Sequence, residues 1–181
     1  MKVKDIVKLA CDFLGNSSLA NALDGTLTDE QSVEVGRLVK CFNLVNSEIA
    51  GEYLPILKAE SLKTTDFKLN FSQFSSQPIK IISVRDNFCR PVRFKVFDGY
   101  LMALAGNVEV EYTTMPEEMD IDDEFSSSLP ERVYAYGVAR EYCFLQSLFD
   151  DADVWDDRFK NTLEALLQRK SEVRIPRRRW I

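Results

Sequence analysis

Histidine is absent from all 181 residues of the chain. It is the side chain that most often serves as a general base near neutral pH, and the commonest ligand of transition metals. The motifs of phosphate-binding loops, dinucleotide-binding turns, nucleophile elbows and zinc proteases are missing as well. We therefore expect no enzymatic activity and no metal or organic cofactor.

Long apolar runs are also missing. None approaches the roughly 20 residues of a membrane helix, so we expect no membrane association. The opening MKVKDIVKLACDFLG has no continuous apolar stretch and no small-residue cleavage site, which argues against a signal peptide. The four cysteines are widely spaced and form no C-x-x-C. We expect free, buried thiols in a reducing compartment, rather than disulfides or a metal site, at Cys11, Cys41, Cys89 and Cys143.

Charge is distributed unevenly along the chain. Residues 116–157 carry 13 acidic and 2 basic side chains, whereas residues 158–181 carry 8 basic and 2 acidic ones. This polarity suits head-to-tail contact with a partner better than wrapping around nucleic acid. The acidic segment 116–128 lacks the pattern of a calcium-binding loop, so we predict a solvated loop.

The first 60 residues have helical periodicity. Thr28 and Gln31 have the spacing of a capping box, and after them apolar residues recur every three or four positions as far as Pro55, which breaks the pattern. Ser128 and Glu131 have the spacing of a second capping box, before another helical stretch. We predict helices within 1–60 and 128–172, with NSSLANALDG as a loop between the first two.

The period changes to two between these helical regions. Alternating residues such as Val108, Val110 and Tyr112 indicate short strands, and Asp98-Gly99 predicts a tight hairpin. We expect an antiparallel meander of four or five strands over 65–114, packed as an appendage on the helical body. Arg93 and Lys95 are expected on its solvated side.

The predicted fold is therefore α+β. A bundle of about four helices with an inserted antiparallel β-meander forms one domain over 1–173, followed by an extended docking arm. We define the docking arm as residues 174–181. These residues are expected to bind a protein partner: Arg174, Ile175, Pro176, Arg177, Arg178, Arg179, Trp180 and Ile181. Arginine and tryptophan are enriched among interface anchors; a frayed terminus is the alternative.

The order of elements resembles the head-to-tail connector, or adaptor, proteins of tailed bacteriophages, of the tail tubular or tail accessory type. An alternating strand ends at Tyr112, Pro116 and an acidic loop follow, and Leu129-Pro130 opens a helix. That helix carries the run Tyr136-Gly137-Val138-Ala139, and a second helix carries an aromatic pair, Trp155 and Phe159. The resemblance covers residues 65–170, and the first 60 residues by architecture alone.

The resemblance implies a structural virion protein that forms a homo-oligomeric ring, commonly of twelve copies, between portal and tail. Its partners are the portal protein, a tail or nozzle protein and, transiently and without specificity, the passing DNA. The docking arm is then expected to bind the portal. It implies a location in the virion neck after assembly in the host bacterial cytoplasm.

Physical reasoning from the residues agrees with a ring. The helix that Leu129-Pro130 opens is apolar nearly all round, and such a helix needs several neighbours. We therefore expect a subunit interface on it, at Tyr134, Tyr136, Gly137, Val138 and Tyr142. The acidic segment, together with Asp150, Asp151, Asp153, Asp156 and Asp157, is expected to include the residues that face the channel, where they repel DNA phosphates. A solvated outer rim is the alternative for these acids. The alternatives are a virion-associated muralytic enzyme that uses a Glu/Asp pair, and a nucleic-acid-binding module.

Overall fold

The computed structural model describes residues 1–170, and side chains as far as residue 167. It has an α+β fold and divides into two compact units. We call residues Met1–Val45, together with the chain from Glu118 onward, the helical unit, and residues Asn46–Glu117 the β unit.

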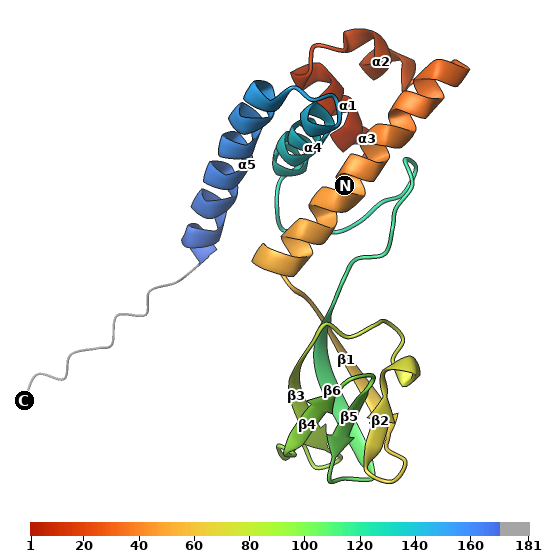
Figure 1. Ribbon diagram of the computed structural model, residues 1–181, viewed down its shortest axis with the longest axis vertical. Helices are drawn as coiled ribbons and strands as arrows, with labels where there is room; N and C mark the ends of the chain where they lie inside the picture. The colour runs from red at the N-terminus through yellow and green to blue at the C-terminus, as the bar shows by residue number, and fades with distance from the viewer. Residues whose placement is uncertain (171–181) are drawn as a thin grey trace, which may run out of the picture. The chain divides into compact units, whose positions relative to one another are not determined.

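The helical unit contains the five helices of Figure 1, with α3 running on into the β unit. They are α1 (Val3–Phe13), α2 (Ser17–Ala22), α3 (Asp29–Glu48), α4 (Glu131–Leu145) and α5 (Phe149–Lys170). The prediction of a loop at NSSLANALDG was wrong, because Asn16 accepts a hydrogen bond from the backbone N–H of Leu19 (3.2 Å) and caps the short α2.

The two predicted capping boxes have different outcomes. At α3 the Thr28 N–H donates to Gln31 Oε1 (3.0 Å) and the Gln31 N–H donates to Thr28 Oγ1 (3.3 Å), so this box is confirmed. At α4 the N-cap is Pro130, which makes no side-chain cap, so the N-cap is not Ser128 as the predicted box requires.

The core of the helical unit follows the predicted periodicities. Val35, Leu38, Phe42 and Val45 of α3 are buried, as are Phe159 and Leu163 of α5. Residues at the start of the chain pair with the acidic segment: the Val3 N–H donates to the Asp123 carbonyl (3.0 Å) and the Phe125 N–H to the Met1 carbonyl (2.9 Å).

The β unit opens with the end of α3 and a π-helical turn at Ile49–Tyr53, which precede its six strands. The strands are β1 (Ile56–Lys63), β2 (Lys68–Asn70), β3 (Lys80–Asp86), β4 (Phe94–Phe97), β5 (Tyr100–Ala103) and β6 (Asn107–Thr114), with a 3-10 turn at Phe71–Gln73. They form two antiparallel three-stranded sheets, ordered β1-β6-β3 and β2-β5-β4 (Figure 1).

Strand β1 corrects the predicted helical region, which extended to residue 60. Pro55 ends the helical pattern, and the next eight residues pair antiparallel with β6, from Ile56 opposite Thr114 to Lys63 opposite Asn107. The first and last strands of the unit therefore lie side by side, and the order is not that of a simple meander. The hairpin at Asp98-Gly99 is confirmed, with Gly99 at φ +79°. The expected exposure of Arg93 and Lys95 is confirmed too.

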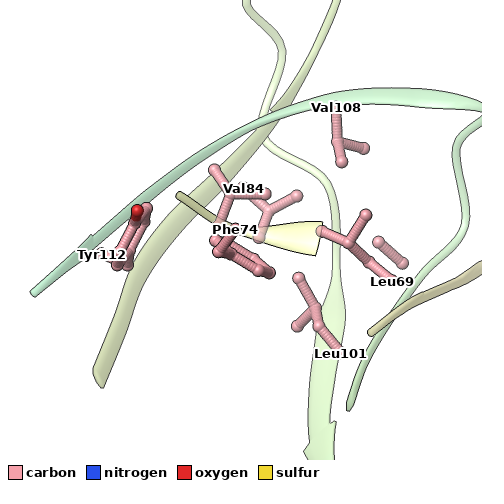
Figure 2. Close-up of a cluster of buried hydrophobic side chains, with 8 residues drawn as sticks. Leu69, Phe74, Val84, Leu101, Val108 and Tyr112 are labelled. Carbon is pink, nitrogen blue, oxygen red and sulfur yellow. The ribbon is translucent and has the colours of Figure 1, made fainter. Parts of the chain in front are cut away.

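The β unit has a hydrophobic core of its own. Figure 2 shows side chains from both sheets converging on one cluster, which contains Leu69, Phe74, Val84, Leu101, Ala103, Val108, Val110 and Tyr112. The ring of Tyr112 lies in this cluster, and its hydroxyl donates a hydrogen bond to the Glu60 carboxylate. The same carboxylate accepts a hydrogen bond from the Ser75 N–H (3.1 Å). Burial opposes ionisation of Glu60, but the hydrogen bonds from Ser75 and Tyr112 outweigh it and lower the pKa of Glu60.

Candidate assembly surfaces

The five residues predicted as a subunit interface lie on α4. Tyr134, Gly137 and Val138 are buried, and Tyr136 and Tyr142 are half-buried. The Tyr134 hydroxyl donates to Ser127 Oγ (2.8 Å), and its ring lies against Phe125, with centroids 5.3 Å apart.

Tyr136 belongs to an aromatic stack that joins three helices. Its ring centroid is 5.1 Å from that of Phe13 on α1 and 5.9 Å from that of Trp155 on α5, and Phe13 and Trp155 are 5.4 Å apart. The guanidinium of Arg158 lies 4.8 Å from the Trp155 ring, in the geometry of a cation–π contact.

Tyr142 links α4 to α3, because its hydroxyl donates a hydrogen bond to the Glu34 carboxylate. Burial of the phenol, followed by this hydrogen bond to an anionic acceptor, raises the pKa of Tyr142 to about 12.

All five predicted interface residues therefore have neighbours within one helical unit. A single chain supplies the partners that an all-round apolar helix needs, and our physical reason for placing a subunit contact on α4 no longer holds.

Arg140 is a buried cation on α4 that the sequence analysis did not single out. Its Nη1 donates to Asp156 Oδ1 (3.0 Å), its Nη2 to Glu141 Oε1 (2.7 Å), and its guanidinium lies 4.9 Å from the Phe159 ring. Lys160 Nζ also donates to Asp156 (2.6 Å). The sequence signal for these ion pairs is the spacing of four between Asp156 and Lys160, which is typical of an ion pair on one helix. The pairing of Asp156 with Arg140 has no such local signal.

Asp156 consequently has a structural role. Burial opposes its ionisation, but the hydrogen bonds from Lys160 and Arg140 outweigh burial and lower the pKa of Asp156. Among the acids predicted to face the channel, Asp156 is the one whose carboxylate binds Arg140 on α4.

The remaining acids of the predicted channel surface are solvent-exposed. Those of the acidic segment and of α5 are Glu117, Glu118, Asp120, Asp122, Asp123, Glu124, Asp150, Asp151, Asp153 and Asp157. Lys2 forms an ion pair with Glu124 (3.4 Å), and the Asp120 N–H donates to Asp123 Oδ2 (2.8 Å).

An open groove runs between α3 and the acidic segment. Asn43 holds this segment in place, since its Nδ2 donates to the Met119 carbonyl (2.9 Å) while its Oδ1 accepts from the Met119 N–H (3.0 Å). Val35, Val39 and Ile121 give the groove apolar walls, and Lys40 lies at its side. These contacts fix the path of the acidic segment on the helical unit.

The turn between α4 and α5 is the surface that the sequence reading missed. Four large apolar side chains are exposed there within six positions, Phe144, Leu145, Leu148 and Phe149. We call these four residues the apolar tip. The signal was present in the sequence as FLQSLF followed by DDAD, but helical periodicity alone does not show where α4 stops.

The docking arm predicted at residues 174–181 lies outside the described residues. Within residues 1–170, no helix is both long enough and apolar enough to span a membrane. The same residues contain no group of three or more cysteine, aspartate or glutamate side chains placed to hold a metal ion.

The sequence matches no protein-family model, and no curated protein matches it.

Proposed function

We propose that this chain is a structural virion protein of a tailed bacteriophage, a head-to-tail connector that forms a ring between portal and tail. The order of elements carries the proposal. Strand β6 ends at Thr114, the exposed acidic segment follows, and buried Leu129 leads into α4, where Gly137 packs closely against α3. The resembling connector proteins have this order.

Surface charge supports passage of DNA without binding. The exposed carboxylates of the acidic segment and of the first turn of α5 repel phosphates, because DNA carries one negative charge per ~1.7 Å of helix axis. A channel wall of this sign lets a genome slide through. The proposal includes no catalytic step and no cofactor.

The proposed partners are the portal protein on one side of the ring and a tail or nozzle protein on the other. The protein is assembled in the bacterial cytoplasm and resides in the neck of the virion. A ring of twelve copies is the number that the resemblance implies.

Electron microscopy of the full chain with purified portal rings of the same phage tests this function. We expect one added layer of density on the axis of the portal, with the same rotational symmetry. The proposal is contradicted if no density for this chain is added to the portal rings at concentrations at which the other proteins of the neck bind. Clearing of a peptidoglycan suspension by the chain contradicts it too and favours the muralytic alternative.

A further inference from the structure

The apolar tip is held in a defined shape by the backbone. Ser147 adopts φ +60°, its N–H donates to the Phe144 carbonyl (3.0 Å), and the Leu148 N–H donates to the Cys143 carbonyl (2.9 Å). The rings of Phe144 and Phe149 lie 6.4 Å apart. The tip is therefore formed before any partner arrives, so a partner that binds it has little ordering cost to meet there.

The apolar tip exposes more apolar side chain than the surface of a protein without a binding partner usually does. The exposed fraction is 42% for Phe144, 60% for Leu145, 49% for Leu148 and 61% for Phe149. Single exposed apolar residues are ordinary, but four neighbouring ones mark an interaction site.

The tip carries negative charge beside its apolar side chains. A shallow hollow is lined by Ser147, Leu148, Phe149, Asp150 and Asp151. Both carboxylates are exposed, and neither forms an ion pair with any other residue whose side chain the structure describes. A partner that fits must offer apolar groups and cations together.

This charge excludes contact between two apolar tips, because like carboxylates would then face each other. The docking arm has the complementary chemistry. It combines four arginines with Ile175, Trp180 and Ile181, in the part of the chain where the charge is most positive. Arginine forms bidentate hydrogen bonds with carboxylates, and tryptophan is a frequent interface anchor.

Chain length argues that the arm comes from another copy. Helix α5 has 22 residues, so Phe149 lies roughly 32 Å from Lys170 at 1.5 Å per residue. A fully extended chain spans at most about 3.6 Å per residue, which places Arg174 within about 14 Å and Arg177 within about 25 Å of Lys170. The arm of the same chain reaches its own tip only if it runs back along α5 almost fully extended, and Arg174 then stays well short of the tip. The arm of a second copy has no such limit.

We propose that the docking arm of one copy binds the apolar tip of the next, with Trp180 in the hollow beside Leu148 and Phe149 and the arginines on Asp150 and Asp151. The contact joins two different surfaces, so successive copies form a closed ring or an open helical filament. This inference rests on the proposed function for closure into a ring. It also moves the arm from the portal, where sequence reasoning placed it, to a second copy.

A labelled peptide of residues 171–181 tests the contact against the full-length protein. We expect saturable binding by fluorescence anisotropy. The substitutions Asp150→Lys and Asp151→Lys together should weaken it more than tenfold, and Leu148→Ser with Phe149→Ser should weaken it to a similar extent. Binding that is absent, or unchanged by both tip variants, overturns the proposal.

Matched controls separate the tip from general charge and hydrophobicity. Asp120→Lys with Asp122→Lys makes the same change of charge on exposed residues of the acidic segment, and Val33→Ser removes an apolar side chain that is 60% exposed on α3. We expect both controls to bind within twofold of the unchanged protein. Equal weakening by the acidic-segment control reduces the contact to non-specific attraction and overturns the proposal.

A charge-reversal pair tests the contact between whole chains. Full-length protein with Arg177→Glu and Arg178→Glu should lose self-association in sedimentation velocity, and combining these changes with the two lysines at the tip should restore it. Failure of the combined variant to associate, with unchanged helicity, counts against the contact. Restored association in a protein that leaves portal rings bare supports the contact and refutes the connector function, so the two proposals fail separately.

Discussion

Gly137 on α4 faces Val45 on α3 so closely that a Cβ atom at position 137 would lie 2.6 Å from Val45 Cγ1. The same atom would lie 3.3 Å from the Phe159 ring on α5. The glycine is therefore the point at which three helices approach one another, and no larger residue fits without displacing a β-branched neighbour with restricted rotamers.

Replacement of Gly137 by alanine is expected to destabilise the helical unit. Overpacking costs about 1–3 kcal/mol, and the better helix propensity of alanine returns about 1 kcal/mol. Urea denaturation should show a net loss of stability that Val45→Ala partly reverses in the double variant. The control is Gly36→Ala on α3, where a Cβ has no neighbour within 4 Å; it should be neutral or stabilising. A stable Gly137→Ala protein contradicts the close packing.

Substitution of Asp156 by asparagine is expected to give a pH-dependent loss of stability. Because the folded pKa of Asp156 is lowered, the carboxylate contributes fully above the unfolded pKa of about 4, and the contribution is lost as pH falls through the folded value. Near neutral pH the variant should lose about 1–3 kcal/mol, since Arg140 loses an anionic acceptor. The difference from the unchanged protein should shrink below about pH 4. Asp157→Asn, an exposed change on the same helix, should show neither effect.

The hydrogen bond between Tyr142 and Glu34 predicts alkaline sensitivity. The neutral phenol donates this bond, so its contribution is complete below the unfolded pKa of about 10 and is lost as pH rises through the folded pKa of about 12. Tyr142→Phe should cost about 0.5–1.5 kcal/mol near neutral pH, by thermal or urea unfolding, and less at high pH. Tyr136→Phe on the same helix is the control, because Tyr136 contributes ring stacking to the described structure. Equal costs for the two variants contradict the assignment.

The cysteines should differ sharply in reactivity. Cys89 is exposed, whereas Cys11, Cys41 and Cys143 are buried and all four are free. Burial is the main cause that raises the pKa of Cys11 to about 11 and of Cys41 to about 12. Alkylation of the native protein followed by peptide mass mapping should label Cys89 alone, and all four cysteines once urea is added. Rapid native labelling of Cys41 contradicts the core packing.

The separate core of the β unit changes what we expect of an isolated fragment. As an appendage, residues 46–117 would not fold alone; with eight buried residues joining both sheets, we expect a cooperative unfolding transition. Leu101→Ala should abolish it, because loss of a buried leucine costs about 2–5 kcal/mol and small domains have little stability to spare. Leu104→Ala, at a side chain that is 73% exposed, should leave the transition in place. A fragment without a transition restores the appendage interpretation.

The α+β class and most helices were predictable because their signals are local. Thr28 and Gln31 are three residues apart, and the apolar positions of α3 repeat within a single helix, so neither needs knowledge of distant residues. The tight hairpin at Asp98-Gly99 is equally local.

The missed features depend on partners far along the chain. Strand β1 contains few strongly β-favouring residues and is stabilised by β6, some 50 positions later. In the sequence Arg140 resembles any surface arginine, because its partners Asp156 and Phe159 lie on the next helix. The exposure of Phe144 and Phe149 could not be predicted either, because exposure depends on which helices fail to cover a surface.

The aromatic stack on α1, α4 and α5 also determines which unfolding events the tryptophan fluorescence of this protein reports. Trp155 stands in that stack, the only other tryptophan of the sequence is Trp180, and the β unit contains none. Intrinsic tryptophan emission therefore records melting of the helical unit and events at the docking arm, but it is silent about melting of the β unit. Replacing Trp155 by phenylalanine leaves Trp180 as the single tryptophan, so the fluorescence of that variant reports docking of the arm without an added label.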